Sequence, residues 1–209
     1  VIAGAGPAGL FCAYILAEAG FRPIVIERGS RVEKRTCDVQ KFWESGILNP
    51  KSNVQFGEGG AGTFSDGKLN TSVKDPSGRN RLVLETFVRF GADASILYDN
   101  KPHIGTDVLS EVIVNMREFL VDKGATFIFD TCVNNLDIVS QKLLSVYTDS
   151  DSNSNSKIKT DVCVLALGHS ARDTFDMLYN KGFDMECKSF AVGFRVEHPQ
   201  RMIDESQYG

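Results

Sequence analysis

The chain has 209 residues, with 23 lysine and arginine residues against 27 aspartate and glutamate residues and a formal net charge of −4. This length suits one large domain, or one domain and part of a second, and it is enough to bury a sizeable core. The charge balance, without any basic tract, argues against nucleic acid as a partner. No apolar run is long enough to span a membrane.

Cysteines and histidines are few and scattered. The five cysteines make an odd number, and no two of them stand in a C-x-x-C or C-x4-C arrangement. We therefore expect reduced thiols and an intracellular, reducing compartment, either the cytoplasm or an organelle reached by a transit peptide outside this sequence. The three histidines lack the spacing of a metal site, so we expect no metal.

The chain opens with a glycine-rich turn between a strand and a helix. Residues 1–3 predict a buried strand, and Gly4, Gly6 and Gly9 follow in the G-x-G-x-x-G spacing. The first glycine of this motif permits a tight turn, the second lets a pyrophosphate approach the backbone, and the third lets the helix pack closely on the strand. The helix N-terminus offers unpaired N–H groups to phosphates. The predicted phosphate-binding residues are Gly4, Gly6, Pro7, Ala8 and Gly9.

An acidic residue follows the next predicted strand. The helix ends at Gly20, the apolar residues 23–26 predict a second strand, and Glu27 and Arg28 come directly after it. A carboxylate at this place can accept hydrogen bonds from both ribose hydroxyls of an adenosine. We expect the Glu27 side chain to be exposed at the sheet edge before a ligand binds. The alternative is a glycine-rich turn that binds no ligand.

A second glycine-rich stretch follows a predicted helix at 31–44. Five glycines fall within the eleven residues 57–67, too many for a good helix or strand. Such a segment can bring its backbone close to a ligand, and its successive N–H groups can form an anion-binding nest. The alternative is a flexible linker. The candidate ligand-binding residues here are Gly59, Gly60, Ala61, Gly62, Thr63, Ser65, Asp66, Gly67 and Lys68.

The middle of the chain predicts two helices and then several strands. The helices are 79–90 and a longer one that Thr106 or Asp107 caps and Gly124 ends. From residue 125 the apolar period changes to two, which is typical of strands. A polar stretch at 149–156 predicts a mobile hairpin tip. His103 precedes the longer helix, and both a ligand contact and a loop histidine bonded to its own backbone remain open.

The last third predicts one more buried strand at a ligand-binding edge. Residues 162–167 form this strand, which closes on Gly168 and is followed by His169 and a helix over 175–182. Ligands of doubly wound sheets bind outside the carboxyl ends of strands, so Gly168 and His169 are candidate site residues. The alternating pattern at 189–197 predicts the first strand of a new unit.

Several of these motifs together carry a family resemblance. The segment 4–27 resembles the ADP-binding end of FAD-binding Rossmann domains of the glutathione-reductase type. The strings at 56–69, 102–107 and 167–174 resemble a family of uncharacterised FAD-dependent, NAD(FAD)-utilising dehydrogenases. The resemblance implies that the backbone at Val133 lies against the adenine and that Gly168 lies beside the flavin. It also implies that FAD is the cofactor.

The expected fold class is α/β, a doubly wound, mostly parallel sheet with an antiparallel β meander. Residues 1–186 would form the FAD-binding Rossmann-type domain, with an insertion at about 31–106, and 187–209 would start a second, substrate-type domain. Because members of the resembled family run much further, we expect this sequence to be a fragment that is incomplete at its C-terminus.

The expected function is that of an FAD-dependent oxidoreductase, dehydrogenase-like, whose partner is a small-molecule substrate or electron acceptor. NAD(P)H is a candidate electron donor. Lys68 is a candidate for stabilising the reduced flavin, with a surface lysine as the alternative, and His169 is a candidate for proton transfer. The alternative functions are a flavin monooxygenase and a non-catalytic binding protein that retains the flavoprotein fold.

Overall fold

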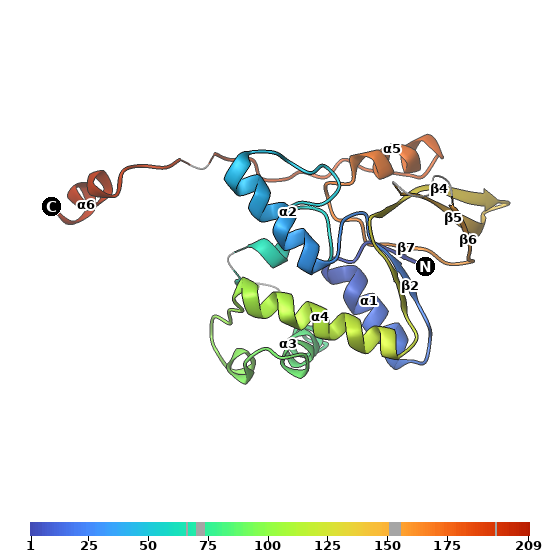
Figure 1. The fold of residues 1–209 in the computed structure, drawn as a ribbon, viewed down its shortest axis with the longest axis horizontal. Coiled ribbons are helices and arrows are strands. Elements are labelled where there is room, and N and C mark those ends of the chain that lie inside the picture. The colour runs from blue at the N-terminus through green and yellow to red at the C-terminus, as the bar shows by residue number, and fades with distance from the viewer. Residues whose placement is uncertain (66, 70–73, 151–155, 195) are drawn as a thin grey trace.

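The computed structural model describes residues 1–65, 67–69, 74–150, 156–194 and 196–209. The predicted site residue Asp66 and most of the predicted hairpin tip, 151–155, lie outside the described residues. A parallel four-stranded sheet has the strand order β3-β2-β1-β7. Its strands β2 and β7 are labelled in Figure 1. Its strands are β1 (Ile2–Ala3), β2 (Ile24–Ile26), β3 (Thr126–Ile128) and β7 (Val164–Leu165).

A second, antiparallel sheet and several helices complete the fold. The second sheet has the order β4-β5-β6, from β4 (Thr131–Val139), β5 (Lys142–Ser150) and β6 (Ser156–Lys159). The α-helices are α1 (Pro7–Glu18), α2 (Val32–Ser45), α3 (Arg79–Arg89), α4 (Thr106–Asp122), α5 (Arg172–Asn180) and α6 (Gln200–Tyr208). Two 3₁₀ helices, η1 (Ala61–Phe64) and η2 (Ala94–Leu97), lie between them. This is the predicted fold class, an α/β protein with a parallel sheet and a separate antiparallel meander.

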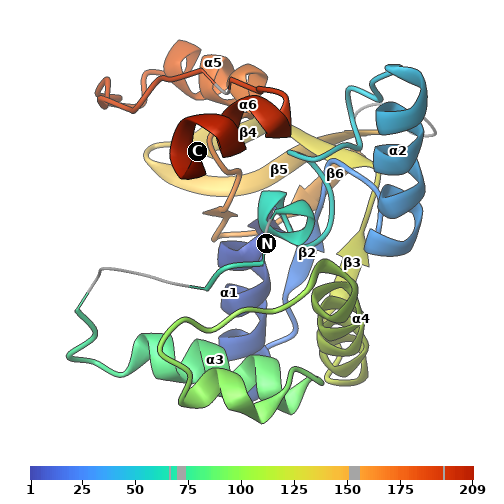
Figure 2. The ribbon, with the colours of Figure 1, turned by 90° about the vertical axis from the view of Figure 1, so that its left-hand side faces the viewer.

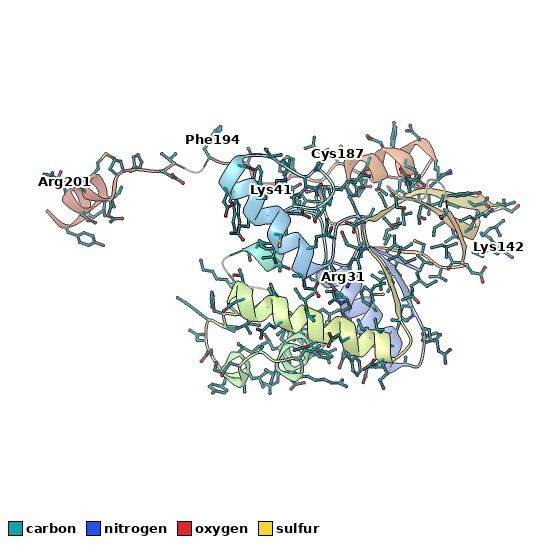
Figure 3. All side chains as sticks on the ribbon, viewed as in Figure 1. Arg31, Lys41, Lys142, Cys187, Phe194 and Arg201 are labelled. Atoms are coloured by element: carbon teal, nitrogen blue, oxygen red, sulfur yellow. The ribbon has the colours of Figure 1, made fainter. Side chains whose placement is uncertain are left out.

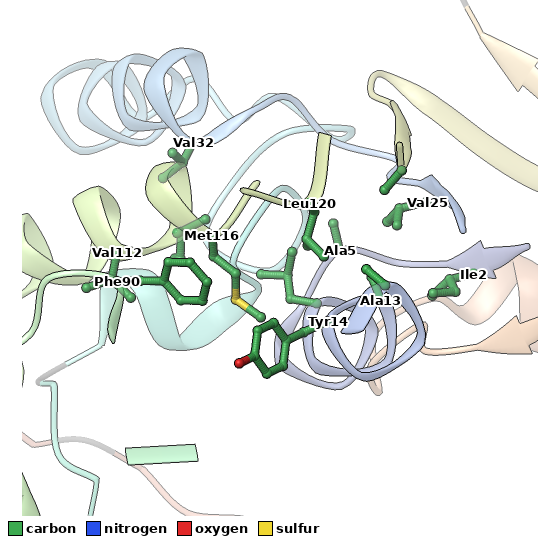
Figure 4. Close-up of a cluster of buried hydrophobic side chains, with 14 of the residues drawn as sticks. Ile2, Ala5, Ala13, Tyr14, Val25, Val32, Phe90, Val112, Met116 and Leu120 are labelled. Atoms are coloured by element: carbon green, nitrogen blue, oxygen red, sulfur yellow. The ribbon is translucent and has the colours of Figure 1, made fainter. Parts of the chain in front are cut away.

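The parallel sheet is covered on both faces, because successive strand residues point to opposite sides. Ile2 and Val25 pack with α1 and α4 in one core, whereas Ala3 and Ile26 pack with the meander and α5 in the other. Figure 2 shows α1 and α4 on one side of the sheet and β4, β5 and α5 on the other. In the larger core, side chains of helices and loops gather around Tyr14 and Met116 (Figure 4). The two cores cover the faces of the sheet, and the carboxyl ends of β1 and β7 lie at an edge that neither core fills.

Most element boundaries follow the sequence pattern, and two expectations are wrong. Gly105, rather than Thr106 or Asp107, is the N-cap residue of α4. The described residues of 189–197 form no strand: this segment leaves the body of the protein in an extended conformation, with Phe194 exposed (Figure 3), and α6 follows it.

The length and hydropathy of the helices bear on membrane association. In the described part of the chain, no helix is both long enough and apolar enough to cross a membrane.

Candidate functional site

The turn between β1 and α1 has the geometry that its three glycines predict. Gly4 adopts a left-handed φ of 107°. A Cβ at Gly9 would overlap the carbonyl oxygen of Gly4, so the glycine at this position permits the close approach of helix and strand. A Cβ at Gly6 would meet only the Cα of Gly60, at 3.7 Å, among the described residues. The backbone at Gly6 is therefore open to a ligand, at the N-terminus of α1.

A cleft of about 570 Å³ lies over this turn. The carboxyl end of β7 forms one wall of it, and the second glycine-rich segment forms another. Of the predicted site residues it brings together Gly4, Gly6, Pro7, Ala8, Glu27, Gly60, Ala61, Gly168 and His169. Segments far apart in the sequence thus meet at the edge where a doubly wound sheet binds its ligand.

Glu27 is not exposed at this edge, contrary to our expectation. Its side chain lies at the end of β2 and the residue is only 5% exposed. Its carboxylate accepts hydrogen bonds from three backbone N–H groups: Ala5 at 2.7 Å, and Gly29 and Gly57 at 2.9 Å each. Glu27 therefore joins the first glycine turn, the loop after β2 and the second glycine segment. A carboxylate has about four acceptor positions, so about one remains for a ligand.

Arg28 and Val133 meet in a smaller pocket of about 40 Å³ beside the cleft. The Arg28 guanidinium stacks over the Phe56 ring at 4.6 Å and donates to Asp173 at 2.7 Å. Burial raises the pKa of Asp173, but the hydrogen bond from Arg28, its positive charge and backbone hydrogen bonds together outweigh burial and hold this pKa below its usual range. Val133 is buried on β4 at the same place. The structure thus brings these two predicted residues together between the meander and the end of β2.

The second glycine segment packs directly against the N-terminus of α1. The Gly59 N–H donates to the carbonyl oxygen of Ala5 at 2.8 Å. Gly60 has a φ of 70°, and a Cβ there would lie 2.8 Å from the Cδ of Pro7. Left-handed backbone and close contact therefore both favour glycine at position 60.

The rest of this segment faces away from the cleft. A separate cavity of about 130 Å³, with apolar walls from α1, α3 and α4, is lined by the predicted residues Pro7, Gly59, Gly62, Ser65, Gly67 and Lys68. Thr63 is fully buried, and its Oγ1 has no hydrogen-bond partner in the part of the chain that the structure describes. Lys68 and His169, the two catalytic candidates, thus line different cavities.

Two buried charged residues that we did not predict hold this segment in place. Arg35 of α2 and Glu58 are both fully buried. The Glu58 carboxylate accepts hydrogen bonds from the Val32 N–H at 2.8 Å and from Arg117 of α4 at 2.7 Å. Burial raises the pKa of Glu58 to about 7 and lowers the pKa of Arg35 to about 10. The sequence signal was present, because Val32, Arg35 and Val39 share one face of α2 and two of them are apolar.

Other cleft residues that we missed are mostly apolar. They come from the segment before the second glycine stretch and from the region of α5, and they include Phe56, Leu167, Phe175, Leu178, Phe183 and Met185. Isolated apolar residues carry no sequence signal that separates a ligand contact from core packing. Of these six, only Phe56 and Leu167 lie within strings that carried the family resemblance.

Comparison with known proteins supports the fold. Residues 2–33 match the family model of the NAD(P)-binding Rossmann-like domain. An uncharacterised protein of Clostridium beijerinckii is 47% identical over 209 residues, and the alignment covers 100% of this chain and 38% of that protein. This chain therefore spans less than half of its relative's length.

The solved structures that are similar to this chain include the following two. The crystal structure of THI4 from Thermovibrio ammonificans has a TM-score of 0.54 and 17% identity, covering 88% of this chain and 62% of that one. A triple mutant of the flavin-dependent brominase Bmp2 has a TM-score of 0.46 and 17% identity, covering 87% of this chain and 40% of that one. The strand order, the family match at 2–33 and the THI4 comparison together show that the chain has a Rossmann-like α/β fold.

Proposed function

We propose that this chain forms the FAD-binding part of an FAD-dependent oxidoreductase. The observation that carries the proposal is the meeting of two glycine-rich segments over the N-terminus of α1, where Gly6 and Gly60 lie in contact with each other and both line the cleft. A side chain at Gly6 would crowd the close backbone approach that a pyrophosphate needs, and one at Gly60 would press on Pro7 and Gly6. The helix N-terminus supplies unpaired N–H donors and the positive end of a dipole at the same place.

The described residues fit an extended dinucleotide. The turn at Gly4 and Gly6 would hold the pyrophosphate, and Glu27 would accept a hydrogen bond from one ribose hydroxyl with its remaining acceptor position. The backbone of Val133 would lie against the adenine, and Gly168 would lie beside the flavin. The cleft volume of about 570 Å³ is within the usual range for cofactor sites.

A bound flavin supplies hydride or electron transfer, while the protein binds and orients it and keeps water away. His169 lines the cleft and is exposed, so its imidazole can exchange a proton with a substrate there. Lys68 lines the separate cavity, and its positive charge would favour a reduced, anionic flavin if the ring reaches that side of the segment. A small-molecule substrate or acceptor, and NAD(P)H as donor, belong to the same proposal.

NAD(P) without flavin is the second candidate, and the family match at 2–33 favours it. FAD is preferred because a second glycine segment faces the first and because an antiparallel meander covers the sheet. Both features belong to the flavoprotein resemblance noted in the sequence. Whether the oxidoreductase is a dehydrogenase or a monooxygenase is a finer question, which stopped-flow detection of a flavin peroxide adduct on reaction with oxygen would answer.

The test is the visible spectrum of the purified protein, followed by reconstitution with FAD or NAD(P)H. We expect a yellow protein that releases all its FAD on acid precipitation. We also expect Gly6→Ala to raise the dissociation constant for FAD by about 10- to 100-fold, because the methyl group displaces a phosphate from a charged hydrogen bond worth about 1.5–3 kcal/mol.

Gly193→Ala is the matched control, since a Cβ there meets no described atom within 4 Å and Gly193 lies on the extended C-terminal segment. Apo Gly6→Ala should unfold at the wild-type urea midpoint. A colourless protein that binds NAD(P)H but not FAD would replace the proposal with the second candidate, and a protein that binds neither would favour a non-catalytic role.

A further inference from the structure

Arg35 is a buried cation whose side-chain hydrogen bonds, within the described residues, all run to backbone carbonyl groups. The residue is 0% exposed. Its guanidinium donates to five carbonyl oxygens of one short segment: Asn53 at 2.9 Å, Val54 at 3.0 Å, Gly57 at 3.3 Å, Glu58 at 2.6 Å and Gly60 at 2.9 Å. Burying a charge is costly unless it is compensated, and here the compensation comes from the five carbonyl groups and from the nearby carboxylates of Glu27 and Glu58.

These bonds orient the peptide groups of the second glycine segment. In a planar trans peptide the N–H points away from the carbonyl of the same unit. Because the carbonyl of Glu58 is turned toward Arg35, the Gly59 N–H is turned away, and it donates to Ala5 in the first glycine turn. The carbonyl of Gly60 is turned the same way, so the Ala61 N–H also points away from Arg35, and Ala61 lines the cleft.

The segment packs against Arg35 on one side and against α1 on the other. A Cβ at Gly57 would overlap the Cδ of Arg35, whereas a Cβ at Gly60 would press on Pro7. The Glu58 side chain adds a third attachment through Arg117. The segment is therefore held between three helices, and one guanidinium sets which way its N–H groups face.

We infer that Arg35 is a positioning residue of the cofactor site: its guanidinium turns the carbonyls of 53–60 inward, so that the Gly59 N–H ties the segment to the first glycine turn and the Ala61 N–H faces the pyrophosphate of the dinucleotide. The inference rests on the proposed function. Arg35 itself touches no ligand. A lysine at this position keeps the positive charge, but its compact ammonium group lacks the planar array of five N–H donors that the guanidinium offers to these carbonyls. The charge alone therefore does not suffice to orient the segment.

The experiment compares FAD binding with stability in Arg35→Lys and in Val39→Ala. Val39 is buried one turn further along the same face of α2, and it lies outside the cleft. FAD affinity is measured by quenching of flavin fluorescence, and apo stability by urea unfolding of the same preparations. We expect Arg35→Lys to raise the dissociation constant by about 10- to 100-fold, the equivalent of one charged hydrogen bond to phosphate, and Val39→Ala by less than about threefold.

If Arg35 has a purely structural role, Arg35→Lys and Val39→Ala should change the affinity for FAD equally, after correction for the difference in their urea unfolding midpoints. That result would overturn the inference. Wild-type protein that binds no dinucleotide would instead overturn the proposed function, so the two failures are separable.

If Arg35→Lys does not fold, amide hydrogen exchange of the wild type decides. We expect the Gly59 amide to be protected in apo protein as well as in the FAD complex. Protection that arises only with FAD would show that the ligand, rather than Arg35, orders the segment.

Discussion

Replacing Glu27 by alanine removes the acceptor that three backbone segments share. In the apo protein, the N–H groups of Ala5, Gly29 and Gly57 all donate to this one carboxylate. Alanine leaves the three donors without a partner at a buried position. We therefore expect Glu27→Ala to destabilise the apo protein as well as to weaken FAD binding.

The magnitude follows from the number of bonds. A buried donor left unsatisfied costs about 1–3 kcal/mol, and the neighbouring cleft lets water reach part of the vacated space. The lower end of that range for each donor gives a loss of about 3 kcal/mol in the free energy of unfolding. With a denaturant slope of about 3 kcal/mol per molar urea, the unfolding midpoint of the apo protein should fall by about 1 M.

Urea unfolding followed by circular dichroism measures this shift. Glu27→Gln should lose part of the same stability, because its amide group keeps one acceptor oxygen but turns a donor toward another donor. Glu111→Ala, an exposed carboxylate on α4, is the control and should leave the midpoint unchanged. An unchanged midpoint for Glu27→Ala together with a tenfold loss of FAD affinity would refute the reasoning and show that the carboxylate serves the ligand alone.

Two further predictions concern charged groups around the second glycine segment. Glu58 faces Arg117, Glu33 and Arg31, and burial raises its pKa from 4.5 to about 7. The folded state thus holds a proton that the unfolded state releases, and stability should fall as the pH rises from about 4.5 to about 7. Urea unfolding at pH 5 and pH 7.5 should show a drop in stability that Glu58→Gln reduces by about 2 kcal/mol. An equal drop in both proteins would contradict the assignment. Lys68→Met should lower the flavin reduction potential of the FAD-loaded protein, measured by reductive titration with a reference dye, because a cation that favours the reduced flavin is lost; an unchanged potential would place Lys68 away from the ring.

The elements themselves were largely predictable from the sequence. Apolar periodicity and terminal glycines place α1 and α2 within a residue or two of their observed limits. The alternating pattern at 189–197 misled us, because alternation describes a half-buried surface, and a strand also needs a neighbouring strand to bond with. The described residues of that segment lie beside no strand of either sheet.

The site was only partly predictable. The spacing of Gly4, Gly6 and Gly9 determines a local turn, so its geometry could be read directly from the sequence. The environment of Glu27 could not be predicted from the sequence, because two of the three N–H groups that donate to its carboxylate lie 22 and 30 residues away along the chain. The same holds for Arg35, whose partners are carbonyl groups that every residue possesses. Hydrogen bonds between a side chain and the backbone do not depend on the identity of the backbone partner. Only glycines, where a side chain would not fit, indicate such a contact in the sequence.

The extended segment before α6 has a practical consequence for handling the protein. Phe190, Val192 and Phe194 are 84%, 79% and 96% exposed. Such a run, apolar at every second position and free of proline, matches the pattern of segments that template cross-β assembly. At high concentration, self-association should therefore begin here and not in the glycine-rich segments. A lysine at position 192 would act as a gatekeeper against it without touching either core.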